Sequence, residues 1–145
     1  MNARTGSVIA FAGAVAGVVV LAMRHALIAT NPVGIAVQVL AVGLMIWARI
    51  TFGRRSFHAA ANPTAGGLVT HGPYRYWRHP IYAAILYFVW AGIPSNPTLE
   101  TVAAAGFVSL CLVARMLFEE QFLRKEYPGY GEYARQTRRV IPFVV

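Results

Sequence analysis

The chain has 145 residues, of which 57% are hydrophobic and only 12% are charged. A disordered chain needs low hydrophobicity, and a soluble globule carries about 25% charged residues, so this composition excludes the first class and disfavours the second. The single cysteine, Cys111, excludes an internal disulfide and a cysteine zinc cluster. The net charge is +8, and in so apolar a chain it indicates anionic lipid head groups rather than nucleic acid as the partner.

Two long uncharged stretches open the sequence. Arg4 and Arg24 enclose 19 uncharged residues, and Arg24 and Arg49 enclose 24. Each stretch can hold a helix of about 20 residues, the length that crosses a bilayer. We therefore predict transmembrane helices over 6–23 and 33–52. A signal peptide is the alternative for the first stretch, but its apolar run is longer than is usual and no clear cleavage site follows.

The next two apolar runs differ in length. Residues 81–93 form a run of 13, about 20 Å as a helix, which is short for a full crossing. Residues 99–120 are long enough, and the turn sequence at 94–97 joins the two runs into a helical hairpin. The sequence thus predicts an all-α integral membrane protein with about four transmembrane helices. A polar loop at 66–80 precedes the hairpin, and a polar tail at 121–145 follows it.

The basic residues predict an orientation. With four crossings, the N-terminus, the polar loop and the tail share one side of the membrane. That side carries 12 of the 13 basic residues, and only Arg24 lies on the other. Because basic loops stay on the cytoplasmic side, we expect both termini in the cytoplasm and the protein in a bacterial-type inner (plasma) membrane.

Polar and aromatic side chains crowd residues 71–82, directly before the third predicted helix. The segment reads His-Gly-Pro-Tyr-Arg-Tyr-Trp-Arg-His-Pro-Ile-Tyr. One interpretation is an interfacial anchor, with Trp and Tyr at head-group level and Arg on phosphates. The other is a pocket for an anionic or zwitterionic molecule. Arg pairs with carboxylates, aromatic faces hold rings or cations, and the N-terminus of the following helix favours an anion.

An acidic pair, Glu119 and Glu120, ends the fourth predicted helix. Ion pairing along the helix is one interpretation, since Arg115 lies four residues before Glu119 and Arg124 four after Glu120. The alternative is that one carboxylate faces inward and binds a cationic group. Neighbouring residues on a helix point about 100° apart, so one Glu can pair while the other serves a pocket.

The tail combines tyrosines, at 127, 130 and 133, with arginines, at 135, 138 and 139. One interpretation is an amphipathic segment on anionic lipid, ended by an apolar plug at 141–143. The four histidines show no metal-ligand spacing, so we expect no metal site. The glycine-rich and nucleophile motifs of the common soluble enzyme classes do not occur in the sequence.

Three blocks follow one another in the sequence: Gly-Leu-Val-Thr with the segment 71–82, then Glu119-Glu120-Gln-Phe-Leu, then Tyr130…Tyr133…Arg138-Arg139-Val-Ile-Pro-Phe. Together they resemble the isoprenylcysteine carboxyl methyltransferase family and its relatives among membrane phospholipid methyltransferases. The resemblance covers about residues 66–143. The family pattern usually continues to a Gly two residues after the Tyr of R-H-P-x-Y. Ala84 stands there in this chain, and we expect it to tighten the cofactor pocket.

The resemblance implies a single membrane-embedded methyltransferase domain over 1–145 that uses S-adenosylmethionine. Arg78 or His79 would bind the carboxylate of the cofactor, and Glu119 or Glu120 its ammonium or a ribose hydroxyl. The expected cofactor-binding residues are His71, Tyr74, Tyr76, Arg78, His79, Pro80, Tyr82, Glu119 and Glu120. The expected catalytic residues are Arg138, Arg139 and Glu120, with the tail closing the site. The acceptor would be small and lipophilic: an isoprenylcysteine-like carboxylate, a thiol or a lipid.

Two rival functions stay open at the level of sequence. A membrane reductase of related helical fold would use the arginine-rich loops for the 2′-phosphate of NADPH. A small interaction or scaffold protein of the membrane would need no cofactor, and its Arg78 and Glu120 could be replaced without loss of function.

Overall fold

The computed structural model describes residues 3–53 and 67–140 of the chain. Five α-helices follow one another: α1 (Ala3–Met23), α2 (Pro32–Phe52), α3 (Pro80–Gly92), α4 (Leu99–Glu126) and α5 (Tyr130–Gln136). Short 3₁₀ helices, η2 (Gly72–Arg75) and η3 (Ile93–Ser95), precede and follow α3. The described ranges contain no β-strand, so the prediction of an all-α protein is confirmed. The predicted apolar plug at 141–143 lies outside them, as do Arg54, Arg55 and His58.

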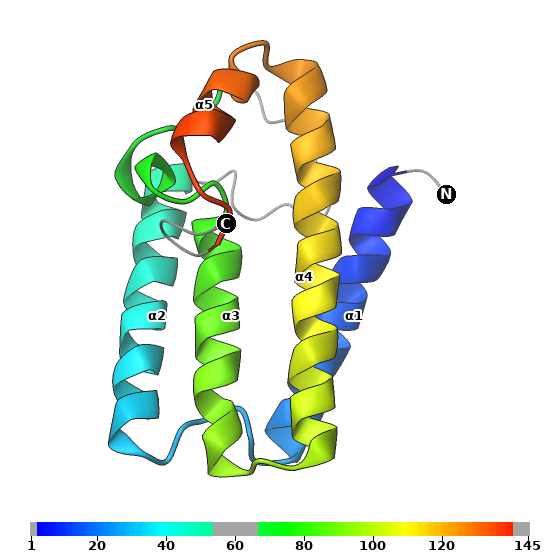
Figure 1. The fold of residues 1–145 in the computed structure, drawn as a ribbon, viewed down its shortest axis with the longest axis vertical. Coiled ribbons are helices and arrows are strands. Elements are labelled where there is room, and N and C mark those ends of the chain that lie inside the picture. Colours follow the sequence, from blue (N-terminus) through cyan, green and yellow to red (C-terminus); the bar gives the residue numbers. More distant parts are fainter. Residues whose placement is uncertain (1–2, 54–66, 141–145) are drawn as a thin grey trace.

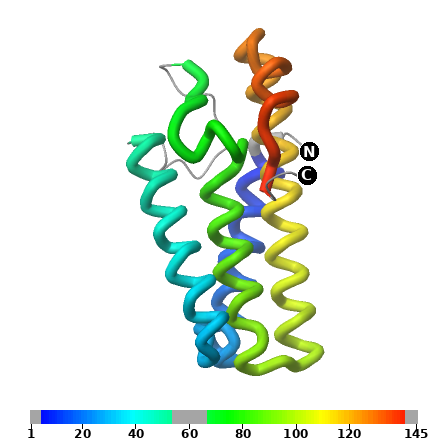
Figure 2. The backbone as a smooth tube through the Cα atoms, turned by 60° about the vertical axis from the view of Figure 1, so that its left-hand side comes forward, coloured from blue at the N-terminus to red at the C-terminus, as the bar shows by residue number. Residues whose placement is uncertain are grey.

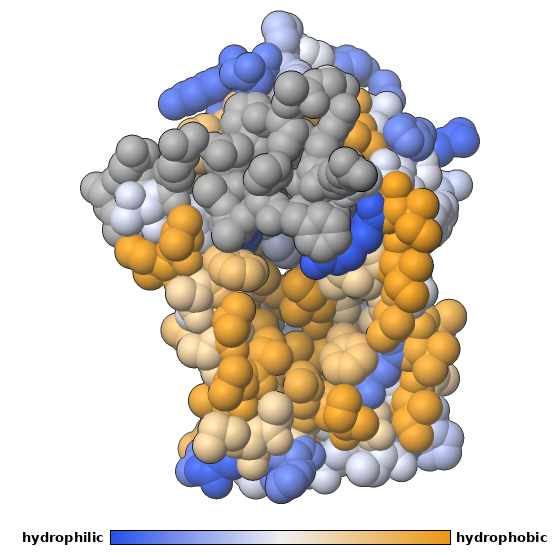
Figure 3. Space-filling model, turned by 180° about the vertical axis from the view of Figure 1, so that it is seen from behind, coloured by the Kyte–Doolittle hydropathy of each residue, from blue (hydrophilic) through white to orange (hydrophobic). Residues whose placement is uncertain are grey.

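Three helices are long and apolar enough to cross a membrane: Thr5–Met23 within α1, Pro32–Phe52 (α2) and Leu99–Glu126 (α4). Many of their large apolar side chains are exposed, as lipid-facing side chains are, and Figure 3 shows an apolar band between two more polar ends. The apolar helix Pro80–Ser95, which joins α3 to η3, is shorter. Helices therefore form over each of the predicted ranges, 6–23, 33–52, 81–93 and 99–120. The number of membrane crossings stays a prediction.

The long helices run up and down side by side (Figures 1 and 2). As a result, the start of α1, the segment that precedes α3 and the end of α4 lie at one end of the bundle, which we call the site end. The turns that join α1 to α2 and α3 to α4 lie at the other, the far end. Arg24 sits at the far end, where it pairs with Glu100. This arrangement has the up-and-down order that the sequence predicted.

The bundle is built from two helix pairs. Helix α1 packs along α4, and α2 packs along α3. Buried apolar side chains join the pairs, among them Leu21 on α1, Val89 on α3 and Val108 on α4. Gly92 allows the turn after α1 to pass against the end of α3, because an added Cβ there would collide with the backbone carbonyls of Ala26 and Leu27.

A buried amide fixes the far end. Gln38 on α2 accepts a hydrogen bond from the Ala29 N–H at 3.0 Å, and its own amide donates to the carbonyls of Leu27 at 2.7 Å and Phe88 at 3.0 Å. These bonds satisfy the polar atoms of Gln38 in an apolar setting. They also hold the α1–α2 turn and α3 in one arrangement.

The sequence places the fourth helix over 99–120 and lets the polar residues after Phe118 continue it until Pro128; α4 ends at Glu126, within that limit. Helix α5 was not predicted. Thr98 and Thr101 form a capping box at the start of α4, at the expected place. The helix continues past Glu120 to Glu126 because residues 121–126 are good helix formers, and it ends where Pro128 disfavours helix at the residue before it. The short α5 then folds back towards α3 (Figure 1), which brings the tail over the site end.

Candidate functional site

The residues that follow α5, which we call the strap (Thr137–Val140), lie against the segment that leads into α3. The strap is joined to it by parallel backbone bonds: Arg138 N–H donates to the Tyr76 carbonyl at 3.1 Å, Arg78 N–H to the Arg138 carbonyl at 2.6 Å, and His79 N–H to the Arg139 carbonyl at 3.2 Å. The Tyr87 hydroxyl on α3 donates to the carbonyl of Val140. The strap therefore supplies acceptors beside the start of α3, where helical N–H groups lack partners.

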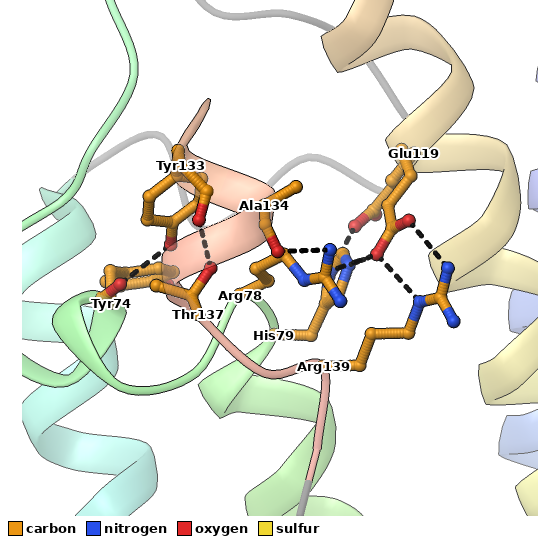
Figure 4. A network of polar contacts seen from close by, with 9 residues as sticks. Tyr74, Arg78, His79, Glu119, Tyr133, Ala134, Thr137 and Arg139 are labelled. Carbon is orange, nitrogen blue, oxygen red and sulfur yellow. Dashed lines mark hydrogen bonds and ion pairs between the residues drawn. The ribbon is translucent and has the colours of Figure 1, made fainter. Parts of the chain in front are cut away.

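Glu120 lies at the centre of the site and is only 4% exposed. The guanidinium of Arg139 binds both of its oxygens, with Nε at 3.0 Å from Oε1 and Nη2 at 3.1 Å from Oε2. His79 Nε2 lies 3.3 Å from Oε1, and Arg78 Nε 3.7 Å from the same atom. Figure 4 shows Arg78 and His79, from the segment that leads into α3, and Arg139, from the strap, pointing towards α4. One carboxylate thus joins three elements of the fold.

Glu119 has different partners. The Tyr82 hydroxyl donates to its Oε1, and Arg115 Nε lies 3.4 Å from that oxygen. Arg115 Nε also donates to the Tyr82 oxygen at 2.6 Å, and its Nη1 donates to the carbonyl of Ser7 on α1 at 3.2 Å. The predicted i,i+4 pair with Arg115 is therefore present. The Oε2 atom of Glu119 has a longer contact, 3.7 Å from His79 Nδ1.

Helix α5 is held against the loop before α3 by buried tyrosines. The Tyr133 hydroxyl donates to the carbonyl of Tyr74 at 2.7 Å, and the Thr137 hydroxyl donates to the carbonyl of Tyr133 at 2.7 Å. Tyr74 also packs on Phe52 at the end of α2, with ring centroids 5.3 Å apart. Burial raises the pKa of Tyr74 and of Tyr133 above the usual value. These contacts fix α5, and through it the strap.

The buried cluster has a surplus of positive charge. It contains three guanidinium groups, of Arg78, Arg115 and Arg139, and two carboxylates, so one positive charge is left over when His79 is neutral. Four buried side-chain atoms have no hydrogen-bond partner among the described residues: Ser7 Oγ, Trp77 Nε1, Arg78 Nε and the hydroxyl of Tyr130. Of these, Arg78 Nε lies 3.7 Å from Glu120, and the charges of Glu120 and Arg78 act on the Tyr130 hydroxyl. Surplus cations with unpaired donors favour a ligand that carries an anionic oxygen.

Tyr130 was named in the sequence as part of the tail but not as a site residue. It is 1% exposed, and the charges of Glu120, Arg78, Arg124 and Arg139 all act on its hydroxyl. Burial, followed by the charge of Glu120, raises its pKa to about 12. The sequence signal was the Tyr-x-x-Tyr spacing of 130 and 133, but only the fold shows that the two hydroxyls differ, since that of Tyr133 has a partner.

The predicted site residues fall into two groups. The structure brings most of them together at the start of α3, the end of α4 and the strap: Arg78, His79, Pro80, Tyr82, Glu119, Glu120 and Arg139. Tyr74 lies in η2, where it contacts Phe52 and Tyr133. His71, Tyr76 and Arg138 are exposed, and Arg138 takes part through its backbone. Ala84 lies in an apolar groove between α1, α2 and α3 whose lining contains none of the charged residues of the cluster. No three His, Cys or acidic side chains of the described ranges gather as metal ligands.

The sequence is similar to those of several known proteins. The chain is 39% identical over 83 residues to protein-S-isoprenylcysteine O-methyltransferase A of Arabidopsis thaliana, an alignment that covers 54% of this chain and 41% of that protein. It is 38% identical over 82 residues to a probable protein-S-isoprenylcysteine O-methyltransferase of Oryza sativa subsp. indica, covering 53% and 41%. It is 34% identical over 76 residues to the cobalt-zinc-cadmium resistance protein CzcN of Cupriavidus metallidurans, covering 52% and 35%.

The aligned parts therefore make up less than half the length of these relatives. No solved structure matches the chain. The family model for phospholipid methyltransferases matches residues 29–129, which include α2, α3, α4 and the two glutamates. The chain belongs to the phospholipid methyltransferase family, and its resemblance to the isoprenylcysteine methyltransferases is confirmed.

Proposed function

We propose that this protein is an integral membrane methyltransferase that uses S-adenosylmethionine to methylate a small lipophilic acceptor. One observation carries the proposal: the cluster around Glu120 has surplus positive charge and two buried donors without a hydrogen bond, and its two glutamates, Arg78 and His79 fall within the residues that the family model matches. A purely structural set of ion pairs does not need buried donors without acceptors, because each such group costs free energy on folding.

The residues of the cluster fit the amino-acid end of this cofactor. Arg78 Nε and the Tyr130 hydroxyl would bind the carboxylate, since both are buried donors without a hydrogen-bond partner among the described residues. Glu119 Oε2 would bind the ammonium, because its contact with His79 is long while both oxygens of Glu120 are taken by Arg139. Arg139, the strap and α5 would then close over the ligand and exclude water.

S-adenosylmethionine supplies a methyl group on a sulfonium, and the sulfur keeps the electron pair of the broken bond when a nucleophilic oxygen, sulfur or nitrogen takes the methyl carbon. The protein's task in such a displacement is to align the reactants and to exclude water. The bonds between strap and α3 would fix that alignment. Because Arg139 and Glu120 bind each other across the site, we propose that they orient the reactants and that Arg139 attracts an acidic acceptor.

The fold also supports a place for the site in the membrane. Of the basic residues whose side chains are described, only Arg24 lies at the far end, so the site end would face the cytoplasm. We propose that 1–145 forms one domain with four crossings in an inner (plasma) membrane. The cofactor would arrive from the cytoplasm and the acceptor from the bilayer, where anionic lipid would surround the basic end.

Calorimetry with purified protein in detergent tests this function. We expect S-adenosylhomocysteine, the product form of the cofactor, to bind and to raise the unfolding temperature, and NADPH at the same concentration to do neither. Transfer of a labelled methyl group into a membrane lipid extract would then identify the class of acceptor. Absence of S-adenosylhomocysteine binding would reject the proposal, and selective binding of NADPH would favour a reductase.

A further inference from the structure

Helix α1 contacts the site through a buried arginine of α4. Arg115 is 3% exposed and lies within a helix that is long and apolar enough to cross a membrane. Its Nη1 donates to the carbonyl of Ser7 at 3.2 Å, and its guanidinium carbon lies over the ring of Phe11, 5.0 Å from the centroid. Charged side chains within membrane helices are costly, so they are held by partners inside the protein and mark functional places. These two partners belong to α1, which precedes the residues 29–129 that the family model matches.

Two glycines let α1 approach α4 this closely. A Cβ added at Gly17 would lie 2.5 Å from Val108 Cγ2, and one added at Gly13 would lie 2.9 Å from Cys111 Sγ. Both distances are too short for a real side chain, so these glycines fix how the two helices lie against each other. The helices run in opposite directions (Figure 1). The first turns of α1 therefore meet the part of α4 that follows Cys111, which contains Arg115.

From Arg115 the contacts continue to the first of the two glutamates. Arg115 Nε donates to the Tyr82 oxygen at 2.6 Å, and the Tyr82 hydroxyl donates to Glu119 Oε1. A carboxylate is planar and rigid, so the bonds that hold Oε1 also fix the direction of Oε2. The Oε2 atom has the longer contact, of 3.7 Å with His79 Nδ1. The side chain of Glu119 is 22% exposed, against 5% for Glu120, so a ligand can reach it more easily.

We propose that α1 is part of the cofactor site, because its contacts with Arg115 position the Glu119 carboxylate that binds the ammonium of the cofactor. The proposal rests on the proposed function and adds the first helix to it. Contacts with Nη1 and with the face of the guanidinium fix its plane, so Arg115 Nε is aimed at the Tyr82 hydroxyl. The Ser7 carbonyl and the Phe11 ring are therefore positioning groups. A side chain that is already fixed loses less conformational entropy when it binds a ligand.

Calorimetry with two ligands tests the proposal. S-adenosylhomocysteine carries the ammonium, whereas its desamino analogue has hydrogen in that place and keeps the carboxylate and the adenosine. A change that acts through Glu119 should lower the affinity for the first ligand and leave the affinity for the second unchanged. Glu119→Gln measures the full effect, and we expect it to weaken S-adenosylhomocysteine binding by about tenfold or more. A change that only loosens the fold should weaken both ligands alike.

The aromatic contact is tested by replacing Phe11. Phe11→Leu keeps an apolar side chain but removes the ring face, and it should weaken S-adenosylhomocysteine binding by about threefold with no change for the desamino analogue. Phe11→Tyr keeps the ring and should keep the affinity. Phe107→Leu is the matched control and should change neither affinity. Both phenylalanines are partly exposed, 41% for Phe11 and 50% for Phe107, but the ring of Phe107 lies beside Gly13.

The arginine itself gives a second, independent test. Arg115→Lys keeps the charge but cannot make the separate Nε and Nη1 contacts, so it should weaken S-adenosylhomocysteine binding by about tenfold and spare the desamino analogue. Ser7→Ala should change neither affinity, since the carbonyl of Ser7 makes the contact. Equal losses for both ligands in Phe11→Leu and Arg115→Lys, or no loss in either variant, would overturn the proposal. Failure of the unmodified protein to bind either ligand would instead reject the proposed function.

Discussion

The Arg139 guanidinium and the Glu120 carboxylate bind each other through two parallel contacts, of 3.0 and 3.1 Å. This pair joins the strap to α4, 19 residues earlier in the chain. The bond to Glu120 raises the pKa of Arg139 further above its already high value, so its positive charge is secure at any physiological pH. One ion pair therefore adds to the backbone bonds that hold the strap, and it ties the strap to α4.

Replacing Glu120 by Gln should weaken both folding and cofactor binding. The change keeps the size of the side chain but leaves Arg139 and Arg78 without their buried counter-charge. Breaking a buried pair in this way costs about 3–5 kcal/mol. Chemical unfolding followed by far-UV circular dichroism, together with calorimetry of S-adenosylhomocysteine, measures the two effects. Glu132→Gln is the control, since Glu132 pairs with Arg135 in full exposure, and it should change neither quantity.

The two adjacent arginines of the strap should differ sharply. Arg139→Ala removes the pair with Glu120 and should lower cofactor affinity by about tenfold or more, about 1.4 kcal/mol. Arg139→Lys keeps the positive charge and should therefore keep part of the cofactor affinity. It should not keep all of it, because an ammonium cannot make the paired bonds of a guanidinium. Arg138→Ala should have little effect, because that side chain is exposed and the backbone makes its contacts. A larger loss of cofactor affinity from Arg138→Ala would contradict this assignment.

Replacing Tyr130 and Tyr133 by Phe, one at a time, should separate the effect on cofactor binding from the effect on folding. Tyr130→Phe loses a hydroxyl that has no partner among the described residues, so the unfolding free energy should stay the same or rise. Its cofactor affinity should fall by about tenfold or more, because a bond to a charged ligand group contributes about 1.5–3 kcal/mol. Tyr133→Phe breaks the bond to the Tyr74 carbonyl and should cost about 1 kcal/mol of stability with cofactor affinity kept. Equal affinities of Tyr130→Phe and the unmodified protein would remove Tyr130 from the site.

The buried tyrosines also predict an alkaline limit of stability. The pKa of Tyr130 is raised to about 12, and those of Tyr74 and Tyr133 are raised as well. An unfolded tyrosine ionises near pH 10, so the folded form is favoured fully below pH 10 and loses this advantage as the pH rises towards 12. Tyrosinate absorbance and circular dichroism, recorded together, should show the ionisation of these buried tyrosines and the loss of helix in one transition. Ionisation of all seven tyrosines near pH 10 with the helices intact would be the contrary result.

Much of the fold could be predicted from the sequence because hydropathy alone marks long apolar helices. The starts of α2 and α4 follow Asn31 and Thr98, whose side chains cap them as expected from their types. Helix α5 could not be predicted, since a seven-residue helix is stabilised by packing, here of Tyr130 and Tyr133, rather than by its own sequence.

The site could be predicted in composition but only partly in pairing. The sequence predicted the pair of Arg115 with Glu119, which the fold contains, but it offered Arg124 as the partner of Glu120, and only the fold shows that Glu120 binds Arg139. His71 and Tyr76 satisfied the same motif as Tyr74, yet they are exposed, because the short η2 turn buries only one face of the segment. A sequence motif fixes which residue types occur and in which order. Whether each of these side chains is buried depends on the segments of the chain that pack against it.

The strap has a consequence for the order in which the protein is made. Its backbone carbonyls bind the N–H groups of Arg78 and His79, which leave the ribosome some sixty residues earlier than Arg138 and Arg139 do. The strap follows all the long helices in sequence. Those helices can thus be synthesised and can enter the bilayer before the strap binds the segment that leads into α3.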